Sequence, residues 1–214
     1  DPRIAHTLNQ KIDKYGHVLE SAAAVYARVK VDDDQSLTGD QRDLIHRVQN
    51  QEQHLMLNCT GYTRDVFAEP SYRLPVPCQS ATWEVTGITP AKKYFSLTEL
   101  KAKDLVTTGA SEIPYHQVAD GTTAQKRLVE CARFLFFAHD LNDHLDFGLQ
   151  GPLSLQYENY KLALTKDLLD RVLVDPVRLN VGYAALNQQT AGYPLSGYYK
   201  GDELFTTNPI ASAP

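Results

Sequence analysis

Strand-favouring and apolar residues form two short runs near the start of the chain, and a polar stretch separates them. This stretch, residues 13–17 with the sequence DKYGH, contains Asp and Gly, which supply turn chemistry. The flanking runs include residues such as Val18 and Val25, which favour a strand. The pattern predicts a β-hairpin over residues 6–29. The charged stretch that follows, residues 32–40, predicts a solvated loop.

Three segments fit more than one element type. Residues 41–57 place their apolar side chains partly at helical and partly at alternating spacing, so helix and strand both stay open. The spacing in residues 123–137 slightly favours a helix, but the run FLFF at 134–137 also suits a strand buried on both faces. Residues 160–164 fit a strand, with Thr165 capping a short helix after it, or the start of one continuous helix.

Proline and capping residues divide the middle of the chain. Three prolines between residues 70 and 77 predict an extended or irregular segment, because proline lacks an amide donor and disfavours helix before it. The alternating sequence TWEVTG at 82–87 predicts a strand that ends at its glycine. Ser96 and Glu99 have the spacing of a capping box, in which the hydroxyl accepts from a first-turn amide and Glu99 reaches back to the Ser96 amide. A helix over residues 97–106 is expected.

Composition is that of an ordinary globular protein. The chain has 214 residues, of which 43% are hydrophobic and 22% charged, enough for a substantial core. The net charge is −5 and the basic residues are scattered, so we expect no nucleic-acid partner. No apolar run approaches the roughly 18 residues of a membrane-spanning helix, and we expect no membrane insertion.

Motifs for common catalytic chemistries are missing from the sequence. It contains no G-x-S-x-G nucleophile turn, no phosphate-binding glycine loop and no H-E-x-x-H metalloprotease pattern. Cys59, Cys78 and Cys131 are odd in number, far apart and without a C-x-x-C pair, so we predict buried or half-buried free thiols. We expect no catalytic, cofactor-binding or metal-binding residues, and no cofactor.

The densest polar cluster is HDLNDHLD at residues 139–146. Its two imidazoles and three carboxylates could in principle surround a divalent cation. However, His139 and His144 are five residues apart and share neither a helix face nor a strand face, so we predict a polar turn between two ordered elements. A metal-dependent hydrolase using His139, Asp140, Asp143, His144 and Asp146 is kept as an alternative function. We interpret His17 and His116, each beside turn-forming residues, as satisfied turn or surface histidines.

Large aromatic residues offer a second alternative. Trp83, Tyr94, Phe95 and the run at 134–137 could line a ligand groove, but such residues are more often core, and core is our prediction. A glycan- or receptor-binding module that presents the aromatic segment 181–214 is the remaining alternative.

Several segments resemble, in order and spacing, motifs of a known family. They are Asp1-Pro2-Arg3 with His6-Thr7-Leu8, Tyr15-Gly16-His17-Val18-Leu19, Thr82-Trp83-Glu84-Val85-Thr86-Gly87, Gln125-Lys126-Arg127-Leu128-Val129-Glu130 with Asp140-Leu141, and Tyr157-Glu158-Asn159-Tyr160-Lys161-Leu162-Ala163. On these segments the chain resembles the C-terminal, Rhs/YD-repeat-like region of the B component of bacterial Tc insecticidal toxins.

The resemblance implies a mainly β fold, an Rhs/YD-type β-hairpin shell fragment with a few short α-helices. It favours a strand for residues 123–137. It implies a shell segment over residues 1–176, followed by a less regular Gly- and Tyr-rich segment over 177–214. The implied role is structural: a secreted multi-subunit toxin would use this stretch to enclose a cytotoxic cargo, and no catalytic residue of the family falls in it. The implied partners are the remainder of its own polypeptide, the toxin's C component and the A-component channel.

Overall fold

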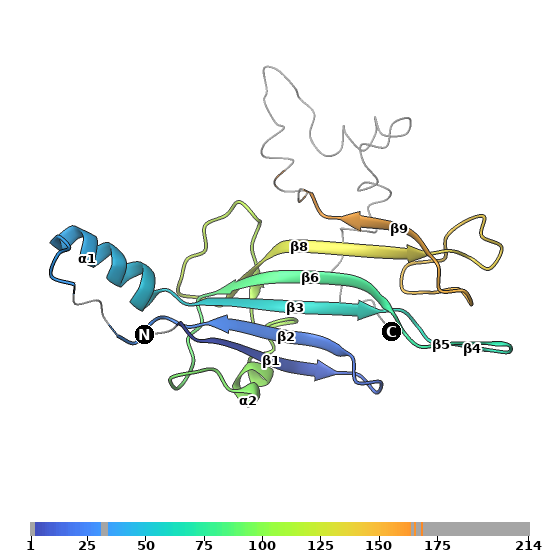
Figure 1. Ribbon diagram of the computed structural model, residues 1–214, viewed down its shortest axis with the longest axis horizontal. Coiled ribbons are helices and arrows are strands. Elements are labelled where there is room, and N and C mark those ends of the chain that lie inside the picture. The colour runs from blue at the N-terminus through green and yellow to red at the C-terminus, as the bar shows by residue number, and fades with distance from the viewer. Residues whose placement is uncertain (1–2, 31–33, 164, 166–167, 169–214) are drawn as a thin grey trace, which may run out of the picture. The chain divides into compact units, whose positions relative to one another are not determined.

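The computed structural model describes residues 3–30, 34–163, 165 and 168. Its elements in chain order are β1 (Ala5–Ile12), β2 (Val18–Val25), α1 (Gly39–His46), the π-helical turn η1 (Arg47–Gln51), β3 (His54–Tyr62), β4 (Val66–Ala68), β5 (Ser71–Arg73), β6 (Pro77–Thr86), α2 (Leu97–Lys103), β7 (Ser111–Glu112), β8 (Gln125–Phe136) and β9 (Gln156–Lys161). Strands predominate in this part of the chain, and the mainly β class with short helices is confirmed (Figure 1). None of the helices in these ranges is long and apolar enough to cross a membrane.

The described strands form one large sheet and one small one. Seven strands make the large sheet in the order β1-β2-β3-β6-β8-β7, and β9 pairs with β8 beside this path. β1 and β2 are antiparallel, as are β8 and β9, whereas the short β7 runs parallel to β8. β4 and β5 form a separate antiparallel pair. β1 therefore lies at an open edge of the large sheet.

The chain divides into two compact units. The first unit comprises Asp1–Asn58, Trp83–Ile113 and Ala119–Arg127, and the second comprises Cys59–Thr82, Pro114–Val118 and Leu128–Pro214. β3, β6 and β8 each contribute residues to both units.

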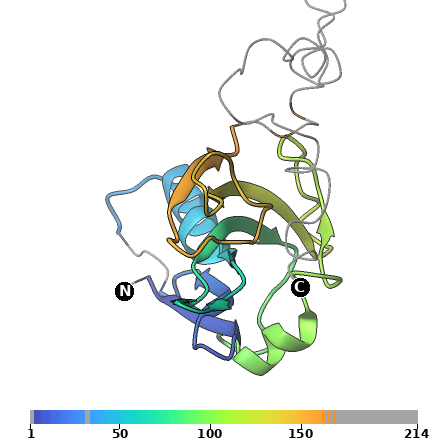
Figure 2. The same cartoon turned by 90° about the vertical axis from the view of Figure 1, so that its right-hand side faces the viewer.

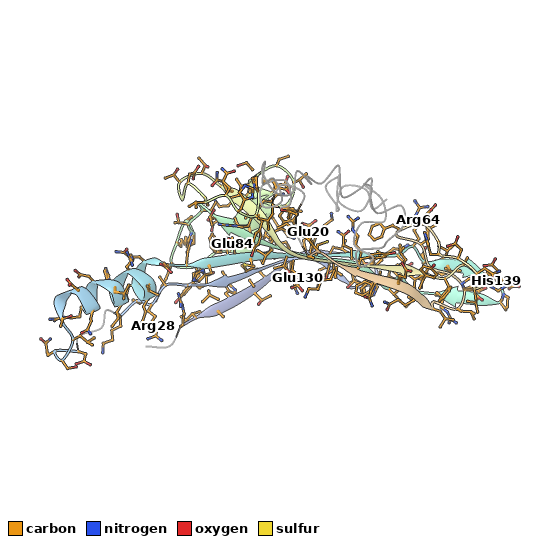
Figure 3. All side chains as sticks on the ribbon, turned by 90° about the horizontal axis from the view of Figure 1, so that it is seen from above. Glu20, Arg28, Arg64, Glu84, Glu130 and His139 are labelled. Atoms are coloured by element: carbon orange, nitrogen blue, oxygen red, sulfur yellow. The ribbon has the colours of Figure 1, made fainter. Side chains whose placement is uncertain are left out.

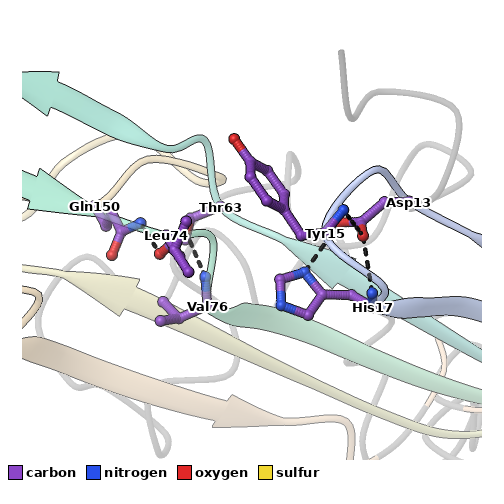
Figure 4. A network of polar contacts seen from close by, with 7 residues as sticks. All are labelled: Asp13, Tyr15, His17, Thr63, Leu74, Val76 and Gln150. Atoms are coloured by element: carbon purple, nitrogen blue, oxygen red, sulfur yellow. Dashed lines mark hydrogen bonds and ion pairs between the residues drawn. The ribbon is translucent and has the colours of Figure 1, made fainter.

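Asp13 closes the turn of the predicted hairpin. Its carboxylate accepts hydrogen bonds from the backbone amides of Tyr15 and His17, both at 2.8 Å, and contacts the His17 ring Nδ1 at 3.0 Å (Figure 4). Gly16 adopts φ +87°, which favours glycine at this position. Desolvation opposes ionisation of the carboxyl, but the bonds from His17 and Tyr15 outweigh it and lower the Asp13 pKa. The hairpin and the role of His17 as a satisfied turn histidine are confirmed.

A layer formed by α2 and the segments around it covers one side of the sheet in the first unit (Figure 2). Two contacts tie this layer to the strands. The Tyr26 hydroxyl accepts from the Phe95 amide at 3.0 Å, and the buried Lys126 ammonium donates to the Val106 carbonyl. The fully or nearly buried apolar side chains of this core are Ala22, Ala24, Tyr26, Leu55, Leu57, Trp83, Val85, Phe95, Leu100, Leu105, Val106, Ala110 and Ile113.

The aromatic residues that were predicted to belong to the core are buried or half-buried. Trp83 and Phe95 are each 3% exposed, and Phe136 in β8 is 6% exposed. Tyr94 is half-buried and packs edge-on against Tyr26, with ring centroids 4.8 Å apart. The prediction of a core role is confirmed for the buried rings, and Tyr94 lines the margin of that core.

Gln10 is a buried polar residue on the edge strand β1. It is 8% exposed, it stands at a register shift between Asn9 and Lys11, and its Nε2 finds no hydrogen-bond partner in the described ranges. A buried donor without an acceptor costs about 1–3 kcal/mol. We expect Gln10→Met to raise the free energy of unfolding in urea by about 1 kcal/mol, and the exposed neighbour substitution Asn9→Met to change it little. A loss of stability in Gln10→Met would show that the amide is satisfied in solution.

The ambiguous segment 41–57 contains elements of both kinds. α1 and η1 occupy its first part, and β3 begins at His54, so each interpretation holds for one part. The helix starts at Gly39, two residues inside the predicted loop, because Thr38 and Gln41 form a reciprocal capping box. The sequence T-x-x-Q carried this signal, and the prediction missed it.

Ser96 caps α2, but Glu99 does not complete the predicted box. The Ser96 hydroxyl accepts from the Glu99 amide at 3.2 Å, whereas the Glu99 carboxylate accepts from the Ala91 amide at 2.9 Å. The carboxylate therefore ties down the loop before the helix. α2 ends at Lys103, where Asp104 adopts φ 45°, so the predicted end at residue 106 was too late.

β8 is a strand, and the helical spacing in residues 123–137 was misleading. It pairs with neighbours on both sides, and this explains the continuous apolar run at its end. β9 shows that the continuous-helix interpretation beginning at residue 160 was wrong. After it, the Leu168 amide donates to the Thr165 hydroxyl at 3.4 Å, as the capping prediction requires. The predicted segment 177–214 lies outside the described residues.

Candidate functional site

The sequence cluster at 139–146 forms a polar turn between β8 and β9. An isolated bridge joins Phe137 to His144, and the Ala138 amide donates to the Asp143 carbonyl at 2.8 Å. The Asp140 carboxylate accepts from the backbone and side-chain nitrogens of Asn142, both at 3.2 Å. These contacts are local, and the predicted polar turn is confirmed.

The same turn does not gather its imidazoles and carboxylates around a common point. Within the described ranges, no three His, Cys, Asp or Glu side chains lie close enough together to hold a metal ion. His139 lies in the loop beyond the end of β8 (Figure 3). The His144 ring instead packs against the Tyr157 ring, with the two ring centroids 5.3 Å apart. The contacts of Asp140 and His144 are thus those of a turn that orders its own backbone.

The second unit also contains a buried polar cluster that the sequence analysis missed. Its centre is Arg133 in β8, which is 5% exposed. The Arg133 Nε donates to the Gln79 Oε1 at 2.8 Å, and the guanidinium lies 4.9 Å from the centre of the Phe147 ring. Cys78 and Cys131 lie close enough to interact electrostatically with the guanidinium. We call these five residues the guanidinium cluster.

Burial controls the ionisation of this cluster. It raises the pKa of the Cys78 thiol to about 11 and also raises the pKa of Cys131, although the nearby Arg133 charge opposes both shifts. Burial lowers the Arg133 pKa. Thiols are nucleophiles only as thiolates, so these two remain weak nucleophiles at neutral pH. All three cysteines, Cys59 included, are buried thiols that are not joined in a disulfide, as predicted.

The raised pKa of Cys78 predicts slow alkylation of the folded chain. At pH 8, a pKa of about 11 in place of the ordinary value near 9 leaves about a hundredfold less thiolate. We expect iodoacetamide to modify Cys78 at least that much more slowly in buffer than in urea, with the rate still rising above pH 9. Peptide mass spectrometry measures both rates. Equal rates in buffer and urea would show that the site is open to solvent.

Buried charge in β8 carried a signal that could have revealed the cluster. Lys126 and Arg133 interrupt a run that is otherwise apolar at its buried positions. Lys126 is 4% exposed, and its ammonium lies 5.1 Å from the centre of the Trp83 ring. Basic side chains at inward positions of a strand must find carbonyl, amide or aromatic partners. Their presence therefore indicates polar contacts within the fold.

Ion pairs connect neighbouring strands across the sheet. Lys11 pairs with Glu20 at 3.2 Å between β1 and β2, and Arg127 pairs with Glu84 at 2.7 Å between β8 and β6. Partly exposed pairs of this kind contribute about 1 kcal/mol or less each. Their main effect is on strand register, because opposite charges must face one another.

The fold of the chain is similar to parts of two solved structures, although its sequence matches no known family. No protein-family model matches the chain, and no curated protein matches it. The crystal structure of TcdB2-TccC3 matches 74% of the chain with a TM-score of 0.51 and 12% identity. The crystal structure of TcdB2-TccC3-Cdc42 matches 89% with a TM-score of 0.58 and 12% identity. The fold is that of a segment of these chains.

The similarity is one of fold, and it extends over only a small share of the length of the matched proteins. This chain covers 7% and 8% of the TcdB2-TccC3 chains in the two structures. At 12% identity, side-chain chemistry does not carry over. The expected relation to Tc toxins is thus confirmed for the fold.

Proposed function

We propose that the chain is a structural segment of a β-walled shell in a secreted toxin complex, and not an enzyme. The observation that carries this proposal is the large open sheet, whose fold matches a segment of the much longer TcdB2-TccC3 chains. An open sheet of this kind exposes edge strands, and a wall built from successive strands removes such edges. The proposed role is to enclose a cytotoxic cargo.

The finer features of the proposal come from the ordered sequence motifs. They support an Rhs/YD-type hairpin unit, with β1 and β2 as one hairpin, in the C-terminal region of a B component. The shell segment would cover residues 1–176. Its partners would be the remainder of its polypeptide, the C component and the A-component channel. The role requires no cofactor.

The edge strand β1 exposes apolar side chains that a neighbouring strand of the wall would cover. Ile4 beside the strand and Ile12 at its end are 41% and 55% exposed. Alternate residues of β1 are also exposed, including Thr7. An uncovered edge with apolar side chains pairs readily with another strand. A neighbouring strand of the same polypeptide would cover it in the complete protein.

Two measurements test the shell proposal. The chain alone should associate at high concentration, as light scattering will show, and Thr7→Lys on the β1 edge should reduce this association because edge lysines oppose strand pairing. Gln41→Glu, on the exposed helix α1, is the control and should leave association unchanged. Expression together with the flanking sequence of its gene should give hollow particles in negative-stain electron microscopy. A monodisperse chain and solid particles would refute the proposal.

A further inference from the structure

The Tyr26 hydroxyl links three parts of the first unit. Tyr26 follows β2 and is 4% exposed, and its hydroxyl oxygen accepts from the Phe95 amide at 3.0 Å. The same oxygen lies 3.3 Å from the ring Nδ1 of His6, a half-buried residue of the edge strand β1. Phe95 directly precedes Ser96, the N-cap of α2. The hydroxyl therefore connects the edge strand to the start of the α2 layer.

The hydroxyl proton determines the form of the His6 ring. Desolvation by burial raises the Tyr26 pKa, so the hydroxyl keeps its proton at neutral pH and can donate it. In the described part of the chain, the one acceptor within its reach is the His6 Nδ1, because the Phe95 amide is itself a donor. A buried donor without an acceptor is costly. The His6 Nδ1 must therefore accept, as it does in the neutral ring with the proton on Nε2.

A proton on the His6 ring removes this acceptor. Both nitrogens of an imidazolium are donors, so the Nδ1–H would then point at a hydroxyl whose own proton has no partner. The folded state thus favours the neutral ring over the protonated one. Histidine gains its proton between about pH 8 and pH 5. The stability that the contact contributes is therefore complete above this range and is lost as the pH falls through it.

Positive charge on the surrounding segments also opposes a proton on His6. The Arg3 Nε donates to the Tyr26 carbonyl at 3.4 Å. The Lys93 ammonium lies 5.4 Å from the centre of the Tyr94 ring, which packs on Tyr26. The last turn of α2 adds Lys101 and Lys103.

Carboxylates on the neighbouring elements are already engaged. Glu99 in α2 acts electrostatically on Tyr26, but its carboxylate accepts from the Ala91 amide at 2.9 Å. Glu20 in β2 pairs with Lys11 at 3.2 Å, near the other end of β1. These contacts hold both carboxylates to other groups, so they do not replace the acceptor that a protonated His6 loses.

The position of this contact gives it leverage over the α2 layer. α2 packs against β1 (Figure 1), and the Phe95 amide leads directly into the helix. We infer that His6 is a pH-sensitive switch: its neutral ring holds the start of the α2 layer on β1 through Tyr26, and its protonated ring releases it. The inference concerns the first unit alone and holds whether or not the sheet forms part of a wall.

Amide hydrogen exchange of the full chain tests the switch. Mass spectrometry of peptides that cover residues 94–103 reports the start of the layer, with rates at pH 7.5 and pH 5 corrected for those of the unfolded chain. We expect protection to fall about fivefold at pH 5, as for the loss of one hydrogen bond. Most carboxyl side chains keep their charge at pH 5. Equal protection at the two pH values would overturn the inference.

Variants assign the effect to His6. His6→Asn keeps an acceptor oxygen that takes up no proton in this range, so protection should stay high at both pH values. His6→Leu has no acceptor and should show protection about fivefold lower at both. His54→Asn changes an exposed histidine at the start of β3 and should behave like the unaltered chain.

A different pattern among the variants would count against the switch. If His6→Asn loses protection at pH 5 as the unaltered chain does, another group is responsible and the inference is wrong. Circular dichroism will verify that each variant is folded. Either result leaves the shell proposal untouched, since that proposal depends on association and particle shape.

Discussion

Gly87→Ala is expected to lower the free energy of unfolding by about 3 kcal/mol or more, because no space exists for a side chain there. Gly87 ends β6 with φ +73°, and an added Cβ would lie 1.7 Å from the Thr123 carbonyl oxygen and 2.4 Å from its carbon. These are backbone atoms, which cannot rotate away as a side-chain end can. Either the end of β6 or the segment before β8 must move.

Thr123 cannot easily move away from an added side chain, because hydrogen bonds to Asp120 fix its position. The Asp120 carboxylate accepts from the amide of Thr123 at 2.8 Å and from that of Thr122 at 2.7 Å, and it also accepts from the Thr123 hydroxyl. The Thr123 bonds, with those of Thr122, lower the Asp120 pKa to about 2. A lowered pKa stabilises the fold above the ordinary carboxyl range, and this contribution is lost as the pH falls toward 2. At neutral pH the obstacle to Gly87→Ala is therefore fully in place.

Gly121 provides a matched control for Gly87. Its φ of +72° is nearly the same, yet an added Cβ would meet nothing within 4 Å. Gly121→Ala should therefore lower the free energy of unfolding by only about 1 kcal/mol, the cost of the left-handed conformation for alanine. Urea unfolding followed by tryptophan fluorescence compares the two variants, since Trp83 lies in the same unit. Equal losses would mean that backbone conformation, and not the contact with Thr123, accounts for the effect.

Local signals in the sequence predicted the elements whose chemistry is local. The β1–β2 turn depends on Asp13 and Gly16, which are adjacent to the strands that they join. The second half of β6, residues 82–86, likewise follows from alternation and from Gly87 directly after the strand, whereas the start of the strand at Pro77 was not predicted. Segment 41–57 resisted assignment because a helix, a π turn and a strand follow one another within it. A single period cannot describe three elements.

Long-range partners explain most of what the sequence left undecided. The strand character of β8 depends on pairing with β6 and β9, which local spacing does not record. The apolar run at 134–137 was compatible with a strand, and the family resemblance then favoured one over a helix. Glu99 bonds to Ala91 in preference to its own helix end, a choice set by the loop's path. Arg133 and Gln79 are 54 residues apart. No motif joins them, so the basic residue at a buried position of β8 indicates a polar partner, but the sequence does not identify Gln79 as that partner.

Arg133→Ala is the second substitution with a large expected effect, a loss of about 3 kcal/mol in the free energy of unfolding. It removes the guanidinium donor from the buried Gln79 oxygen and empties the space beside Phe147. Both changes occur at a residue that is 5% exposed, where water cannot easily replace the lost contacts. Urea unfolding measures the loss.

Arg127→Ala, on the same strand, is the matched control. Its Nε pairs with the Glu84 carboxylate at 2.7 Å, but these side chains are 23% and 34% exposed, so about 1 kcal/mol or less should be lost. Arg133→Met then separates charge from volume, because methionine fills much of the arginine stem without a donor. A buried charge contributes little net stability when an apolar side chain of similar volume can replace it. Stability close to the unaltered chain in Arg133→Met would assign the loss in Arg133→Ala to packing, and equal losses in both would assign it to the hydrogen bond with Gln79.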